Sequence, residues 1–170
     1  MYGSLRIRRA KPADVELIFS LIVELAEYER ARERVVGTPA LLAAALFGDD
    51  PLAESVIAEL DGEPAGFALW FRTFSTWLCV PGLWLEDLYV SPQHRRAGVG
   101  RALLAHVARV AADNGCGRVE WSALHWNAPA LEFYAGLGAE RLEEWEVHRL
   151  EGETLARLAA AGAASEPCGP

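Results

Sequence analysis

Cysteine, lysine and long apolar runs are scarce in this chain of 170 residues. Its three cysteines lie far apart and include no Cys-x-x-Cys pair, which excludes a disulfide framework and a zinc site. The longest strongly apolar stretch, Pro39–Phe47, covers only half a membrane span. The N-terminus alternates polar and apolar residues, unlike a signal peptide. These absences predict a cytoplasmic protein with no metal site and no membrane contact.

The charge balance is acidic, with a formal net charge of −8 at pH 7. Because an acidic surface repels phosphate backbones, nucleic acid is not an expected partner, whereas a cationic small molecule is. The content of 52% hydrophobic and 24% charged residues is ordinary for a globular protein and excludes a disordered chain. The length predicts one domain over residues 1–158, followed by an unstructured Ala/Gly/Pro tail over residues 159–170.

Hydrophobic periodicity and turn residues predict strands and helices in alternation. The expected strands are Leu5–Arg8, Glu54–Leu60, Ala65–Phe74, Leu83–Val90, Arg118–Ser122 and Leu142–Leu150. The expected helices begin at Pro12, Pro39, Gly98 and Asn127, with a last short one over Gly152–Leu158. Asp61-Gly62 predicts a hairpin between the second and third strands. This order is typical of an α/β fold with a mixed sheet and helices on both faces.

One glycine-rich motif stands between a predicted strand and the clearest predicted helix. Arg95-x-x-Gly98-x-Gly100 is neither the dinucleotide-binding G-x-G-x-x-G nor a P-loop. Its glycines let the backbone approach a ligand closely, and amides at a helix start point toward an anion. Arg95, Arg96 and Arg101 would add charge-assisted contacts to a phosphate. The alternative is a glycine-rich turn with solvated arginines.

The motif and its flanking elements resemble the GNAT superfamily of N-acetyltransferases, whose acetyl-CoA signature is Q/R-x-x-G-x-G/A. Four segments resemble the spermidine/spermine (diamine) and thialysine acetyltransferase branch in order and spacing. They are LAEYE (Leu25–Glu29), LWLEDLYV (Leu83–Val90), RRAGVG (Arg95–Gly100) and HWNAPALEFYAGLGA (His125–Ala139). The resemblance covers Leu5 to Leu158 and implies the GNAT fold, an α/β fold with a mixed central β-sheet of six to seven strands. It also implies acetyl-CoA as the co-substrate.

The resemblance also implies the residues that hold the acetyl donor. In similar enzymes the pantetheine arm pairs like an extra strand with the fourth strand, and the pyrophosphate lies on amides at the start of the next helix. A strand edge suits this role because it offers unpaired N–H and C=O groups. The implied cofactor-binding residues are Leu88, Tyr89, Val90, Arg95, Arg96, Ala97, Gly98, Val99, Gly100 and Arg101, with Asn127, Ala128, Pro129 and Ala130 bounding the remainder.

Tyr134 is the expected general acid. Acetyl transfer from a thioester to an amine expels a thiolate, and a phenol with an ordinary pKa near 10 can protonate it at neutral pH. Similar enzymes place their general acid at this tyrosine of the Phe-Tyr pair. The alternative is that Phe133 and Tyr134 are aromatic core residues.

Acidic residues predict the acceptor side. Glu86 and Asp87 are consecutive on a predicted strand, so their side chains are expected on opposite faces. The resemblance implies that Glu86 is catalytic, binding the amine and relaying its proton through water. It implies further substrate contacts at Tyr28, Glu29, Glu120, Trp121, Ser122 and Glu146, with Glu144 as the alternative to Glu146. For each glutamate, the alternative is a solvated surface charge.

The sequence therefore predicts an acetyl-CoA-dependent N-acetyltransferase that acts by direct amine attack on the thioester. The expected acceptor is a small-molecule amine: a polyamine, a diamine or a thialysine-like amino acid. The alternatives are an aminoglycoside or protein amino group as acceptor, or a non-catalytic acyl-CoA-binding sensor. Similar enzymes are homodimers that exchange or pack C-terminal strands, and Leu142–Leu150 is the expected strand for that contact.

Overall fold

The computed structural model of the protein describes residues 3–163. It divides the chain into two compact units, Met1–Ser122 and Ala123–Pro170, where the sequence predicts one domain over residues 1–158.

The first unit is built around a five-stranded sheet, one or two strands fewer than the six to seven expected. Its strands are β1 (Leu5–Arg9), β2 (Glu54–Leu60), β3 (Glu63–Ser75), β4 (Val80–Val90) and β5 (Val119–Glu120). Its α-helices are α1 (Val15–Tyr28), α2 (Pro39–Phe47) and α3 (Val99–Asp113). Short 3-10 helices cover Pro12–Asp14, Arg32–Arg34 and Pro92–His94. The predicted elements of this unit are all present, although the predicted strand Arg118–Ser122 contracts to two residues.

The sheet is mixed, as expected. Strands β1 to β4 form an antiparallel meander in sequence order, and β5 pairs parallel to β4. The turn between β2 and β3 consists of Asp61 and Gly62, whose φ angles are +55° and +88°. Two consecutive residues with positive φ match the twist of a two-residue hairpin, so the predicted hairpin is confirmed.

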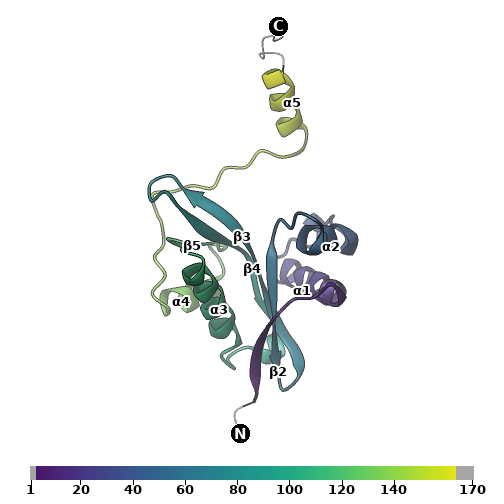
Figure 1. Ribbon diagram of the computed structural model, residues 1–170, viewed down its shortest axis with the longest axis vertical. Helices are drawn as coiled ribbons and strands as arrows, with labels where there is room; N and C mark the ends of the chain where they lie inside the picture. The colour runs from purple at the N-terminus through teal and green to yellow at the C-terminus, as the bar shows by residue number, and fades with distance from the viewer. Residues whose placement is uncertain (1–2, 164–170) are drawn as a thin grey trace. The chain divides into compact units, whose positions relative to one another are not determined.

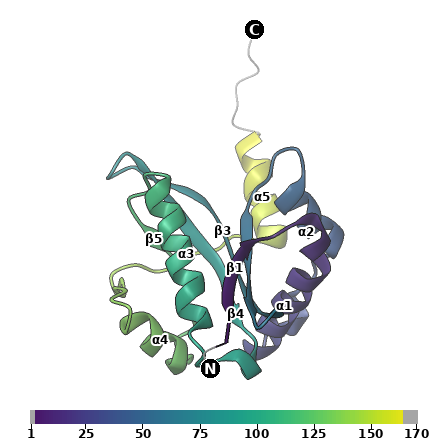
Figure 2. The same ribbon diagram turned by 60° about the horizontal axis from the view of Figure 1, so that its bottom comes forward.

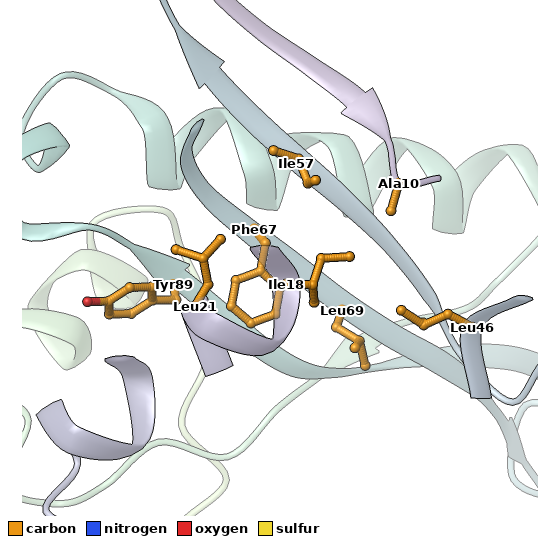
Figure 3. Packing of buried hydrophobic residues seen from close by; sticks show 8 residues of the cluster. All are labelled: Ala10, Ile18, Leu21, Leu46, Ile57, Phe67, Leu69 and Tyr89. Atoms are coloured by element: carbon orange, nitrogen blue, oxygen red, sulfur yellow. The ribbon is translucent and has the colours of Figure 1, made fainter. Parts of the chain in front are cut away.

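Helices cover both faces of the sheet, which confirms the predicted layers. Helices α1 and α2 lie against one face and α3 lies against the other, as both ribbon views show (Figure 1 and Figure 2). The α1 face is closed by a cluster in which Ile18 and Leu21 of α1 pack with Phe67 and Leu69 of β3 and with Tyr89 of β4 (Figure 3).

The opposite face is closed by α3. The side chains that α3 buries are Val99, Leu103, Leu104, Val107 and Ala111, the stripe that its 3.6-residue periodicity predicts. From the sheet, Trp70 of β3 reaches this layer, with its ring centroid 6.3 Å from that of His106. Trp70 and Leu69 are adjacent in β3 and point to opposite faces, which fixes the two sides of the sheet at this position.

The second unit contains helices α4 (Ala128–Ala135) and α5 (Gly152–Ala163). The predicted strand Leu142–Leu150 is wrong, because this segment has no strand pairing in the described chain and all its residues are exposed. Alternation of apolar and polar residues produces a strand only where a neighbouring strand accepts its hydrogen bonds. The predicted unstructured tail begins too early, since α5 continues through residues 159–163, and residues 164–170 lie outside the described part.

Within residues 3–163, no helix is long and apolar enough to span a bilayer. The same residues contain no cluster of His, Cys, Asp and Glu side chains that could hold a metal ion.

Candidate active site

The outer edge of β4 is largely free in the described sheet. Strand β5 pairs with β4 only at Leu83 and Trp84, so the stretch from Leu85 to Val90 has a neighbour on its β3 side alone. On that inner side Gly66 of β3 lies so close to β4 that a Cβ atom there would overlap the carbonyl oxygen of Tyr89. The stretch Leu88–Val90 is thus pinned to β3 and offers its other edge to a strand-like ligand.

The loop that follows β4 leads into an uncapped helix start. Gly98 is the N-cap of α3 with φ +81°, and Arg96 two residues before it also has a positive φ, +63°. No side chain caps α3 and no acidic residue lies in its first turn. The first intrahelical hydrogen bond runs from the Ala102 amide to the Gly98 carbonyl at 3.0 Å. The amides before Ala102 therefore lack carbonyl partners within the helix and lie at the positive end of its dipole, an arrangement that favours an anion.

A β-bulge at Glu86 reorders the acidic residues of β4. Leu85 lies opposite Trp70 and Asp87 lies opposite Leu69, so Glu86 is an extra residue without a partner in β3. Because residues in register share a face, Leu85 belongs to the α3 side and Asp87 to the α1 side.

Glu86 belongs to the same α1 side as Asp87. Its carboxylate accepts a hydrogen bond from the indole of Trp84 at 2.9 Å, and Trp84 lies opposite Phe71, on the face that Leu69 also occupies. The prediction that Glu86 and Asp87 point to opposite faces is therefore wrong. It assumed a regular strand, and one inserted residue reverses the alternation.

Asp87 has the most perturbed carboxyl group of the described chain. Burial, together with the smaller effects of the negative charges of Glu86 and Glu29, raises its pKa to about 7. Glu29 caps the C-terminal end of α1, and burial raises the pKa of its carboxyl as well. Among the described residues, no ion pair or hydrogen bond engages the Asp87 carboxyl. Asp87 thus lies close enough to Glu29 and Glu86 to feel both charges, and in the described part of the chain no cation pairs with it.

From the sequence, Glu86 is the expected catalytic carboxylate and Asp87 has no expected role. The only signal in the sequence was the adjacency of two acidic residues. The bulge that brings them together depends on the pairing of β4 with β3, and the burial of Asp87 depends on α1. Neither the bulge nor this burial could be predicted from the local sequence pattern.

The predicted general acid belongs to the second unit. The side chain of Asn127 accepts a hydrogen bond from the Ala130 amide at 3.4 Å and so caps α4, which carries Pro129 in its first turn. Tyr134 lies near the end of this helix, half-buried, with its ring centroid 5.3 Å from that of Phe133 and the two planes tilted by 56°.

The remaining predicted substrate residues lie in varied settings. Glu120 is half-buried and pairs with Arg118 at 2.7 Å, and the next residue, Trp121, is also half-buried while Ser122 is exposed. Glu146 is exposed in the second unit, 3.9 Å from His148, and Glu144 is exposed as well. Within the first unit, the fold brings Tyr28 and Glu29 to the end of α1, the layer that Asp87 faces.

Comparisons with known proteins decide the family. The acetyltransferase (GNAT) family model matches residues 20–139, well over half of the chain. The chain belongs to the GNAT acetyltransferase family. It is an amine N-acetyltransferase, since its relatives include thialysine N-epsilon-acetyltransferase of Bos taurus, 38% identical over 164 residues that cover 90% of this chain and 96% of the relative.

Further matches agree with this assignment. L-ornithine N5-acetyltransferase of Arabidopsis thaliana is 30% identical over 195 residues, which cover 88% of this chain and 86% of the relative. Among solved structures, an integron cassette protein from the mobile metagenome of V. cholerae has a TM-score of 0.76 at 28% identity, with 92% of this chain and 98% of that one covered. The predicted GNAT fold and the diamine/thialysine branch are confirmed.

Proposed function

We propose that this GNAT acetyltransferase moves an acetyl group from acetyl-CoA to the primary amine of a small cationic acceptor. The acceptor class is a basic amino acid of the thialysine or ornithine type, a diamine or a polyamine. The observation that carries the proposal is the site formed by the three carboxylates on the α1 side of β4, next to the free edge of that strand.

The donor side of the proposal rests on two features of the first unit. The uncapped start of α3 suits the pyrophosphate of acetyl-CoA, because its amides and dipole favour an anion and its first turn holds no competing carboxylate. The free edge of β4 suits the pantetheine arm, which carries amide groups that can pair like a strand. When bound there, acetyl-CoA supplies the activated acetyl group.

The acceptor side follows from charge. A primary amine is cationic at neutral pH, so Glu86, exposed and held by Trp84, attracts it electrostatically. The amine must then lose a proton before it can attack the thioester. Asp87 has a pKa of about 7, so at neutral pH its carboxyl can both exist as the base and hold the proton it receives. Tyr134 is proposed to protonate the departing thiolate.

The test is an amine panel in which release of free CoA is followed with thialysine, ornithine, lysine, putrescine, spermidine, an aminoglycoside and a peptide N-terminus. Basic amino acids or diamines are expected to give the largest kcat/KM, by at least about tenfold, because a second cationic or polar group adds a contact to the three carboxylates. A larger kcat/KM for the aminoglycoside or the peptide would contradict the proposed acceptor class. A reaction without amine gives the background hydrolysis.

Substitution of Gly98 tests the donor site. Gly98→Asp places a negative charge at the start of α3, beside the proposed pyrophosphate, and is expected to weaken acetyl-CoA binding at least about tenfold. Gly98→Asn is the matched control, because Asn and Asp tolerate the positive φ of +81° alike and no neighbouring atom lies within 4 Å of a Cβ there. Isothermal titration of both variants with acetyl-CoA separates the effect of the added charge from the effect of the added side-chain volume. Equal affinities for Gly98→Asp and the wild type would show that the anion does not bind at these amides.

We further propose that the chain forms a homodimer. The segment from Leu142 to Leu150 contains a turn at residues 143 and 144 and no described strand, and it carries exposed Trp145 (60%) and Val147 (76%). A second copy of the chain can supply hydrogen-bond partners for the backbone of this segment by strand pairing. Two-fold dimers are also the commonest soluble oligomers. Light scattering at micromolar concentration should then give twice the chain mass of 18.6 kDa. A species of one chain mass at every concentration would contradict this.

A further inference from the structure

The arginine of the glycine-rich motif lies against two tyrosine rings. The guanidinium carbon of Arg95 is 4.7 Å from the ring centroid of Tyr28 and 5.9 Å from that of Tyr89. Its Nε donates a hydrogen bond to the carbonyl oxygen of Val90 at 3.1 Å. The side chain therefore reaches from the loop after β4 back to the end of β4 and to the last residue of α1.

The same end of β4 is tied to α1 by a second set of contacts. Glu24 lies one helical turn before Tyr28, on the same side of α1. It accepts a hydrogen bond from the Tyr89 hydroxyl at 3.1 Å and one from the Ser91 hydroxyl at 3.5 Å. Tyr89 and Ser91 are buried, so these contacts fix the point from which the loop departs.

The loop contains one strained residue. Arg96, the residue after Arg95, has a φ of +63°, whereas the φ of +81° at Gly98 is one that glycine adopts without strain. An arginine gains nothing intrinsic from the left-handed region, so the surrounding contacts must hold Arg96 there. Arg95 lies directly before the strained residue and is held by its contacts with the two rings and by its hydrogen bond to Val90.

We propose that Arg95 is a positioning residue, which, stacked on Tyr28 and Tyr89 and bonded to Val90, holds the loop of residues 91–98 in the shape that binds the acetyl donor. This role rests on the proposed function, because it takes acetyl-CoA as the ligand of that loop. It makes Tyr28, on α1, a determinant of donor affinity although it lies outside the glycine-rich motif.

A double-mutant cycle on acetyl-CoA affinity tests the role. Arg95→Lys keeps the charge but loses the planar guanidinium and the Nε donor, and Tyr28→Leu removes the aromatic face. Each change is expected to raise the acetyl-CoA Kd, measured by isothermal titration, about 3- to 10-fold. The Kd of the double variant should exceed the larger of the two single-variant Kd values by no more than about twofold, because both changes remove the same contact.

Three further variants make the cycle specific. Tyr28→Phe keeps the ring and should keep the Kd within about twofold of the wild-type value, which shows that the ring and not the hydroxyl is required. Arg109→Lys is the matched arginine control, since in the described structure Arg109 forms an exposed ion pair with Asp113 on α3, and its replacement should leave Kd and kcat unchanged. Should Tyr28→Leu fail to fold, Tyr28→Met removes the ring with a longer side chain and replaces it in the cycle.

The outcomes separate this role from the proposed function. If Tyr28→Leu binds acetyl-CoA like the wild type while Arg95→Lys binds weakly, Arg95 contacts the donor directly and the positioning role is overturned. Additive effects of the two changes overturn it as well. If the wild-type chain does not bind acetyl-CoA at all, the proposed function fails and this role fails with it.

Discussion

Replacing Tyr134 with phenylalanine is expected to lower kcat about 10²- to 10⁴-fold, the usual contribution of a general acid. The change keeps the aromatic ring, which lies 5.3 Å from that of Phe133, and deletes only the hydroxyl. Packing in the second unit should therefore persist, and the loss should fall on protonation of the leaving thiolate. Steady-state kinetics with the best acceptor of the panel measure the effect.

Two controls accompany this variant. Its melting temperature and its acetyl-CoA affinity should match those of the wild type, so that the loss in kcat is not a loss of fold or donor. Single-turnover measurements must show that chemistry limits the rate. If Tyr134→Phe then turns over at the wild-type rate, another group or water protonates the thiolate, and Tyr134 is an aromatic packing residue.

Asp87→Asn is expected to lower kcat/KM about 100-fold or more, because the amide cannot accept the proton of the amine. In the wild type, kcat/KM should rise as pH increases through about 7, the pKa of Asp87, since only the ionised carboxyl is a base. That rise should disappear in the variant. A pH profile that is the same for both proteins would remove Asp87 from the proton path.

The same variant should be more stable than the wild type at alkaline pH. The pKa of Asp87 is raised from 3.8 to about 7, so between these values the folded chain keeps a proton that the unfolded chain has lost, and the free energy of unfolding falls as pH rises. Above pH 7 the full penalty is present, on the order of 2–4 kcal/mol. Asn carries no charge and so removes this penalty. Urea unfolding should therefore show that Asp87→Asn increases the free energy of unfolding more at pH 8 than at pH 5.

Glu86→Gln is the matched comparison for Asp87→Asn. Glu86 is exposed and held by Trp84, so its replacement should change the free energy of unfolding little at either pH. It should instead raise the KM of the amine, because a charge that attracts the cation is lost. If Glu86→Gln shows the large stability gain and Asp87→Asn does not, the two carboxylates have been assigned in the wrong order.

Local patterns in the sequence were enough for most of the first unit. The stripe from Val99 to Ala111 predicts both the helix α3 and its buried side, because a period of 3.6 residues leaves one face apolar. Asp61-Gly62 predicts the hairpin, because few residue pairs tolerate two positive φ angles. In the second unit, the continuation of α5 to Ala163 was not predicted, although alanine has the highest helix propensity.

Features that depend on pairing were not readable. The segment from Leu142 to Leu150 alternates like a strand, but alternation does not state whether a partner strand is present. For the site, the glycine-rich motif located the loop and α3, whereas the stacking of Arg95 on Tyr28 joins residues 67 positions apart. Glu86 and Asp87 share a side of the sheet because the β-bulge inserts one residue that has no partner in β3, and no local sequence pattern predicts this insertion.

The bulge divides β4 into two stretches whose side chains alternate between the two faces of the sheet in opposite order. Up to Leu85, the odd-numbered residues face α3, and from Asp87 onward the odd-numbered residues face α1. At the step, Glu86 and Asp87 both lie on the α1 side, so the inserted residue adds a second carboxylate to that side without removing an apolar side chain from either layer. A one-residue deletion there would reverse one stretch and expose its apolar side chains.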